Sequence, residues 1–136
     1  MANEKILIID DDDDLVHALR LPLEAVGYEV SRAVNGNEGL QKVKEFHPDL
    51  IILDVMMDTI TEGFHVSLTL RSPDPRSEYK AYSRIPILML TSIHSKSSLR
   101  FGPDQDYLPV DAFLEKPIEP AELLKKVREY LSKKPA

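Results

Sequence analysis

The sequence predicts an α/β protein built on a single doubly wound parallel sheet. Short runs rich in Ile, Leu and Val are bounded by polar residues, as buried parallel strands are; they are KILII (5–9), LIIL (50–53), IPILML (85–90) and DAFLE (111–115). Segments with helical apolar spacing alternate with these runs, which favours right-handed crossovers between parallel strands. With 136 residues and 43% hydrophobic content, the chain supports one core. We therefore expect one domain over residues 1–136 and no output domain.

The first strand leads into an acidic run and then a helix. The helix is expected from about Asp13 to Val26, with Gly27 in the usual stop position. Its apolar residues recur at near-helical spacing: Leu15, Leu19, Leu23 and Val26. Pro22 removes one backbone donor and clashes with the preceding turn, so we expect a kink near residues 18–20.

A second strand and a second helix come next. YEVSRAV (28–34) has the composition of a strand and ends at the Asn35-Gly36 turn signal. The helix should cover residues 36–46, with Leu40, Val43 and Phe46 facing inward. His47-Pro48-Asp49 ends it, and LIIL, the most apolar run, is expected at the centre of the sheet.

The second half of the chain carries weaker signals. A third helix is predicted over residues 63–71, a long loop over 72–84 and a final helix from about Glu119, with Pro120 in its first position. Four apolar residues should be buried on that final helix: Leu123, Leu124, Val127 and Leu131. Glycine and prolines within residues 92–109 argue against a full-length helix. The fourth helix should therefore be short or irregular, with a turn near residues 96–101.

Composition excludes several classes of function. Seventeen basic against 23 acidic residues give a net charge of -6, which disfavours nucleic acid or an anionic membrane as the main partner. The chain contains no cysteine, so disulfides, thiolate metal sites and a cysteine nucleophile need no consideration. The N-terminus is too short and too acidic for a signal peptide, and no apolar run is long enough to span a membrane. We expect a cytoplasmic protein.

The strand ends carry the candidate site. Asp10 and Asp11, Asp54, Thr91 and Lys116 each stand at or just beyond the end of an apolar run. The carboxyl ends of parallel strands meet at one edge of a sheet, so these residues should converge. Carboxylate oxygens suit Mg²⁺, which makes Asp10 and Asp11 metal-ligand candidates, with a solvated charge run as the alternative.

The other aspartates of the acidic run are expected to cap a helix, and the residues at the other strand ends supply the groups needed for phosphoryl transfer. We expect Asp12, Asp13 and Asp14 to cap the helix that follows. Asp54 is well placed to attack phosphorus and form an acyl phosphate, with Mg²⁺ also bound to its carboxylate. The hydroxyl of Thr91 can donate to a phosphoryl oxygen, and Lys116 supplies positive charge; Lys116-Pro117 is a candidate cis peptide.

With these residues assembled, the chain resembles the receiver domain of two-component response regulators. The resemblance lies in KILIIDDDDDL, HPDLIILDVMM, IPILMLTS and DAFLEKPIEPAEL, which cover nearly the whole chain in the family's order. It implies a flavodoxin-like fold with strand order 2-1-3-4-5. It also implies phosphorylation of Asp54 by a sensor histidine kinase or a histidine phosphotransfer protein, with the Met56 backbone carbonyl as a further Mg²⁺ ligand. Thr91 and Lys116 become a switch pair, and Phe113 takes the place of the aromatic rotamer switch.

Such a protein is a signalling phosphoacceptor and not an enzyme, with only intrinsic Mg²⁺-dependent self-phosphorylation and slow self-dephosphorylation. Its signal would pass by docking to an unknown downstream protein or by phosphotransfer, and we expect a monomer or weak dimer. Three features depart from the family. In the loop after Asp54, Asp58 stands where a proline is usual and Gly63 comes one position late; Ser92 replaces a common alanine. The largest departure is residues 92–109, where the family places its fourth helix and this chain has glycine and prolines.

Two other functions stay open from the sequence. A binding module could keep this fold and signal without phosphate, as the unusual composition of residues 92–109 suggests. An aspartate-nucleophile phosphohydrolase also combines Asp, Thr and Lys on a parallel sheet, but commonly needs a second carboxylate two residues after the nucleophile. Here that position is Met56.

Overall fold

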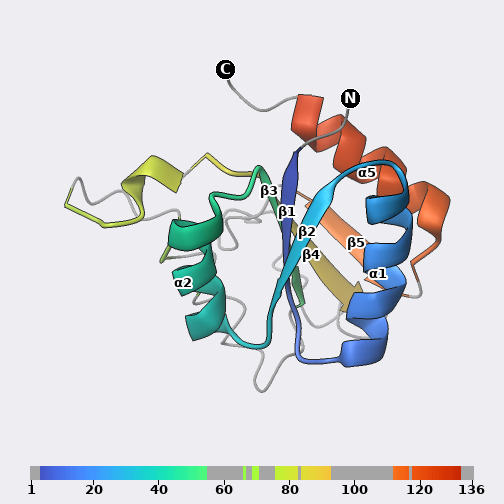
Figure 1. The fold of residues 1–136 in the computed structure, drawn as a ribbon, viewed down its shortest axis with the longest axis horizontal. Coiled ribbons are helices and arrows are strands. Elements are labelled where there is room, and N and C mark those ends of the chain that lie inside the picture. Colours follow the sequence, from blue (N-terminus) through green and yellow to red (C-terminus); the bar gives the residue numbers. More distant parts are fainter. Residues whose placement is uncertain are drawn as a thin grey trace, which may run out of the picture.

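The fold is described from a computed structural model, in which residues 4–54, 66, 69–70, 76–82, 84–92, 112–116 and 118–132 are placed well enough to describe. Five parallel strands form one sheet in the order β2-β1-β3-β4-β5 (Figure 1). They are β1 (Lys5–Ile9), β2 (Glu29–Ala33), β3 (Leu50–Asp54), β4 (Ile87–Ser92) and β5 (Ala112–Lys116). This confirms the predicted doubly wound sheet and the central place of the most apolar strand.

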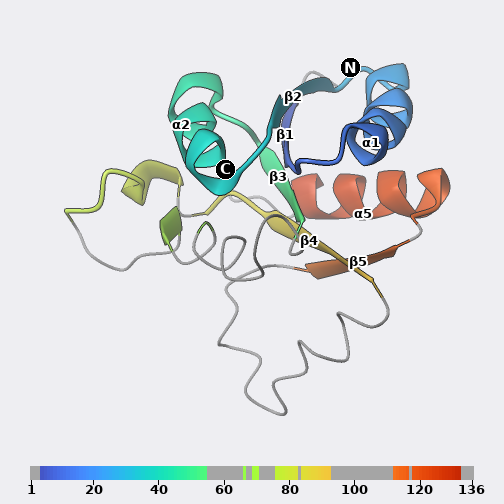
Figure 2. The ribbon, with the colours of Figure 1, turned by 90° about the horizontal axis from the view of Figure 1, so that it is seen from below.

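Helices cover both faces of the sheet. α1 (Asp13–Ala25) and α5 (Pro120–Ser132) lie on one face, and α2 (Gly36–Phe46) lies on the other (Figure 2). Alternate residues of each strand supply the two cores: Ile6 and Ile8 pack toward α1 and α5, whereas Leu7 and Ile9 pack toward α2. None of the helices in the described part of the chain is long and apolar enough to cross a membrane.

α1 begins and ends where the sequence predicts, within one residue. Asp12 caps it by accepting from the backbone N–H groups of Asp14 and Leu15, and Gly27 takes a positive φ of 102° just beyond its end. Val26 shares the near-helical spacing but follows the last helical turn and is 39% exposed. Val16 is buried in the core. Pro22 lies inside the helix, and the kink stays a prediction.

α2 has the predicted bounds, and local signals explain both ends. The Asn35 side chain accepts from the Glu38 N–H, and the Glu38 carboxylate accepts from the Val34 N–H at 2.9 Å, so two donors at the helix start are satisfied. His47 closes the helix in the left-handed region, with φ of 54°, and donates its N–H to the Val43 carbonyl. Leu40 and Val43 are buried and Phe46 packs against the core, as predicted.

The residues before β4 fold back onto α2. Within the predicted loop, Lys80–Tyr82 forms a 3-10 turn, η1. Tyr79 and Tyr82 pack against the core on the α2 face, and the Tyr82 hydroxyl lies 3.4 Å from Nδ1 of His47. An ion pair between Lys44 and Glu78 adds a second link between this segment and α2. The two tyrosines therefore contact their own domain.

Several predicted boundaries shift by a residue or two. β4 begins two residues later than predicted, because the Ile85 N–H donates to Tyr82 within the preceding turn. β5 begins and ends one residue later than predicted, and α5 begins at Pro120. Leu123 and Val127 are buried as predicted, but Leu124 and Leu131 are only partly buried. The third helix is described only at Val66 and residues 69–70, which are helical, and residues 93–109 lie outside the described part.

Candidate functional site

Two carboxylates are buried at neighbouring strand ends. The parallel pairing of Ile9 with Leu53 places Asp10 and Asp54 one step further along β1 and β3. Asp10 is fully buried and Asp54 is 3% exposed, and they are the two buried acidic residues of the described chain. By strand alternation, both lie on the face of the sheet that Ile8 and Ile52 share. Two carboxylates so placed repel each other, and a cation between them would offset that repulsion.

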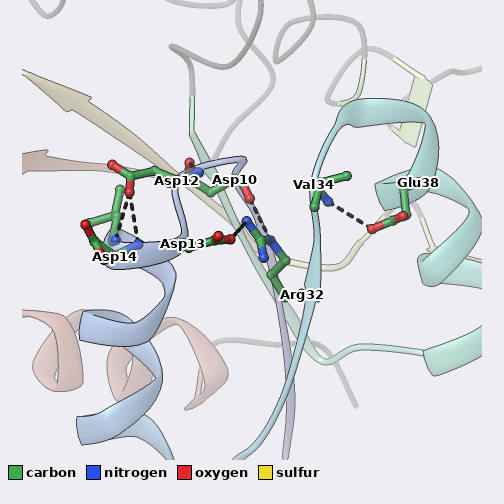
Figure 3. Close-up of polar contacts among 8 residues, drawn as sticks. Asp10, Asp12, Asp13, Asp14, Arg32, Val34 and Glu38 are labelled. Carbon is green, nitrogen blue, oxygen red and sulfur yellow. Dashed lines mark hydrogen bonds and ion pairs between the residues drawn. The ribbon is translucent and has the colours of Figure 1, made fainter.

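The acidic loop after β1 is held by hydrogen bonds from several directions (Figure 3). The Asp10 N–H donates to the Ala33 carbonyl at 2.9 Å, and the Asp10 carboxylate Oδ1 accepts from the Asp12 N–H at 2.9 Å. Arg32 reaches across from β2, where its Nε donates to the Asp10 carbonyl at 2.9 Å and its Nη2 lies 2.7 Å from Oδ1 of Asp13. These contacts order the loop, which is therefore more than a run of solvated charged residues.

The five consecutive aspartates divide into two kinds. Asp10 is buried, whereas Asp11, Asp12, Asp13 and Asp14 are exposed. Asp12 caps α1, and Asp13 and Asp14 lie in its first turn, which confirms the predicted helix-start role of these three residues. Asp11 has no such local role in the described contacts; its side chain is exposed, and it stands in the sequence between the buried Asp10 and the cap residue Asp12.

The remaining site residues lie on β4 and β5 or outside the described chain. Asp54 pairs with Leu90, Thr91 pairs with Glu115, and the pairing continues one step to Lys116. The sheet thus brings the backbones of Asp54, Thr91 and Lys116 to the same carboxyl edge. Phe113 pairs with Met89 in the interior of β5. Met56, Asp58, Gly63 and Pro117 are outside the described residues, so their predicted roles stay predictions.

The donor set fits Mg²⁺ in its chemistry. Among the described residues, no three His, Cys, Asp or Glu side chains lie close enough together to hold a metal by themselves. Mg²⁺ does not need three, because it usually keeps several waters and takes one or two carboxylates. The buried pair Asp10 and Asp54 supplies hard oxygen donors of that kind, and Asp11 follows Asp10 in the sequence with an exposed side chain.

Arg32 is the residue of this region that the sequence did not single out. A lone arginine near the end of a polar strand is normally solvated, and nothing in its local sequence marks it. The available signal was topological: in the order β2-β1-β3, residue 32 pairs with Ile8 and so lies beside the end of β1.

Comparison with known sequences identifies the family. The sequence model of the response regulator receiver domain matches residues 6–128. The alkaline phosphatase synthesis transcriptional regulatory protein PhoP from Bacillus subtilis is 35% identical over 129 residues, which cover 95% of this chain and 49% of that protein. The chain thus spans about half the length of the curated relatives it matches.

Comparison with solved structures agrees. The chemotaxis response regulator CheY4 of Vibrio cholerae has a TM-score of 0.77 and 29% identity, covering 95% of this chain and 99% of that one. The receiver domain of the sensor histidine kinase PA1611 from Pseudomonas aeruginosa, solved with a magnesium ion coordinated in its active site cleft, has a TM-score of 0.76 at 19% identity. It covers 96% of this chain and 99% of that one, and at this identity the likeness is one of fold.

Proposed function

Because the chain belongs to the response regulator receiver family of two-component signalling, we propose that it acts as a phosphoacceptor and that Asp54 receives the phosphoryl group. The observation that carries this proposal is the burial of Asp10 and Asp54 together at neighbouring strand ends. Burial of a carboxylate is costly to a fold unless hydrogen bonds, an opposite charge or a cation offset it, and ionisable groups kept in such surroundings cluster at functional sites. A merely structural aspartate at a strand end would more often be solvated or used as a helix cap.

The proposed reaction moves one phosphoryl group from histidine to aspartate. A carboxylate oxygen of Asp54 attacks phosphorus of a phosphohistidine, the P–N bond breaks, and the departing imidazole nitrogen takes up a proton. The product is an acyl phosphate on Asp54. Bound Mg²⁺ would neutralise the charge that develops on the phosphoryl oxygens.

Each remaining site residue has a proposed role of its own. Asp10, Asp11 and Asp54, with the Met56 backbone carbonyl, would hold the cation. The Thr91 hydroxyl would donate to a phosphoryl oxygen, and Lys116 would pair first with Asp54 and then with the phosphoryl group. Movement of Thr91 toward the new anion would let Phe113 turn inward, with a cis peptide before Pro117 aiming Lys116 at the site.

The partners follow from the same chemistry. The phosphodonor would be a sensor histidine kinase or a histidine phosphotransfer protein, and the signal would leave through a downstream protein. PhoP is by name a transcriptional regulatory protein, whereas the net charge of -6 disfavours direct binding of nucleic acid by this chain. A single domain over residues 1–136 without an output domain, a cytoplasmic location and a monomeric or weakly dimeric state stay predictions.

Labelling with a small phosphodonor tests the proposal. Incubated with acetyl phosphate and Mg²⁺, the wild-type chain should gain the mass of one phosphoryl group, and it should gain none with EDTA. Asp54→Asn should gain none under either condition, whereas Asp49→Asn, at the opposite end of the sheet, should label like the wild type. Labelling of Asp54→Asn to the wild-type stoichiometry would contradict the proposal. Sustained turnover of small phosphate esters would indicate the phosphohydrolase instead.

A further inference from the structure

Arg32 makes two directed contacts with the acidic loop from a different strand. Its side chain is 21% exposed, and the guanidinium divides between two acceptors, with Nε on the Asp10 carbonyl and Nη2 on the Asp13 carboxylate. Figure 3 shows the side chain extending from β2 across to the loop. Asp13 is 86% exposed, so a pairing with it contributes little to stability by itself. The contact with the buried main chain is the more constraining of the two.

These contacts bear on the residue between Asp10 and Asp12. The Asp10 carbonyl belongs to the peptide group that precedes Asp11, and Arg32 holds that carbonyl at 2.9 Å. The Asp12 N–H belongs to the peptide group that follows Asp11, and the Asp10 carboxylate holds it at 2.9 Å. Both peptide groups that flank Asp11 are therefore anchored, while the Asp11 side chain is exposed. This arrangement fixes the direction in which an exposed carboxylate leaves the backbone.

Lysine could not replace arginine here without loss. The Nε and Nη2 atoms of a guanidinium are held in a rigid planar group, so one side chain can reach a carbonyl and a carboxylate in different directions. A lysine amine is a single point on a flexible stem. The peptide before Asp11 would then lose either its anchor or the pairing that steadies the anchor.

We propose that Arg32 is a positioning residue that orients Asp11 for Mg²⁺, an inference that rests on the proposed function. Arg32 itself does not bind the cation, and its positive charge repels it. Positioning and charge therefore have opposite effects on Mg²⁺ affinity. If Arg32 acted by charge alone, removing it would tighten Mg²⁺ binding; if it positions Asp11, removing it weakens binding.

The test is a Mg²⁺ titration of the whole chain followed by backbone amide NMR. Arg32→Met should bind Mg²⁺ roughly tenfold more weakly than the wild type, as loss of an outer-shell anchor does at other metal sites. Arg32→Lys should bind more weakly as well, despite its retained charge. The matched control is Arg20→Met, because Arg20 also pairs with a carboxylate, Glu24, and donates to a carbonyl, that of Val30 at 3.4 Å. It should bind Mg²⁺ no more weakly than the wild type.

A second readout separates positioning from general damage. In the metal-free protein, Arg32→Met should shift the amide signals of Asp11 and Asp12 while the signals of β3 and α5 stay in place. Mg²⁺ binding by Arg32→Met as tight as the wild type or tighter would overturn the inference. If Arg32→Met does not fold, the test uses Arg32→Lys. A Mg²⁺ affinity of Arg32→Lys equal to that of the wild type would also overturn the inference.

The outcome is distinguishable from failure of the proposed function. A wild-type chain that binds Mg²⁺ and is labelled on Asp54, together with unchanged binding by Arg32→Met, overturns the role of Arg32 alone. A wild-type chain that binds no Mg²⁺ and takes no phosphoryl group overturns both.

Discussion

The two ends of the sheet use aspartate in different ways. At the amino end, Asp49 and Lys5 are joined reciprocally: the Lys5 N–H donates to the Asp49 carboxylate at 2.8 Å, and the Asp49 N–H donates to the Lys5 carbonyl at 2.7 Å. The Lys5 amine also donates to the Phe46 carbonyl and lies 5.3 Å from the centre of the Phe46 ring. These contacts tie β1 to the segment between α2 and β3.

At the carboxyl end, two of the aspartates are deeply buried, whereas Asp11 to Asp14 are exposed. Asp10 and Asp54 are more buried than Asp49, which is half-buried, and they lie side by side with like charge. An aspartate whose carboxylate closes a backbone hydrogen bond between segments stabilises the fold. A pair of buried carboxylates of like charge works against stability and is suited to chemistry. Position along the strand therefore separates Asp49, which stabilises the fold, from the two buried aspartates for which we propose chemistry.

The largest expected effect is that of Asp10→Asn. The amide oxygen can still accept from the Asp12 N–H, but one negative charge beside Asp54 is lost. We expect Mg²⁺ affinity to fall by at least roughly a hundredfold, beyond the usual effect of an outer-shell change. The free energy of unfolding without Mg²⁺ should stay the same or rise, because a buried charge has been removed. Mg²⁺ titration measures the affinity, and urea unfolding measures the stability. A clear loss of stability would contradict the view that the buried carboxylates at the carboxyl end of the sheet work against stability.

Gly39→Ala should lower both stability and Mg²⁺ affinity, because it disturbs the end of β1 just before Asp10. A Cβ at Gly39 would lie 2.5 Å from Cδ1 of the fully buried Ile9, and such overpacking costs about 1–3 kcal/mol. The better helix propensity of alanine offsets at most about 1 kcal/mol of that. Urea unfolding should show a net loss of stability and Mg²⁺ titration a modest loss of affinity. Asn37→Ala, at an exposed position on the same helix, is the control and should not destabilise.

Asp49→Ala should change the fewest properties, because it acts on stability alone. It removes the acceptor of the Lys5 N–H, and loss of such a hydrogen bond costs about 1–2 kcal/mol. Chemical unfolding should show that decrease, while labelling by acetyl phosphate and Mg²⁺ affinity stay at wild-type values. A loss of labelling without a loss of stability would show that the amino end of the sheet takes part in function, and would contradict the difference drawn between the two ends.

Much of the fold was predictable because its signals are local. Asn35 and Gly36 mark the start of α2, Gly27 marks the end of α1, and the apolar runs mark strands to within two residues. Apolar periodicity does not show which residue is the last to face the core: Val26 follows the periodic pattern but lies just beyond α1 and is exposed. The segment before β4 is a harder case, because η1 and the packing of Tyr82 depend on contact with α2.

The site divides in the same way. The sequence by itself determined which chemical groups stand at the strand ends, because a buried apolar run followed by Asp, Thr or Lys can be recognised without knowing its neighbours. Only the tertiary structure decided that Asp10 is buried while Asp11 is exposed, that a Cβ at Gly39 would meet the Ile9 side chain, and that Arg32 holds the peptide before Asp11. The physical reason is that burial and hydrogen bonding across strands depend on sheet order and register, which bring residues 10, 32 and 54 together from three separate strands.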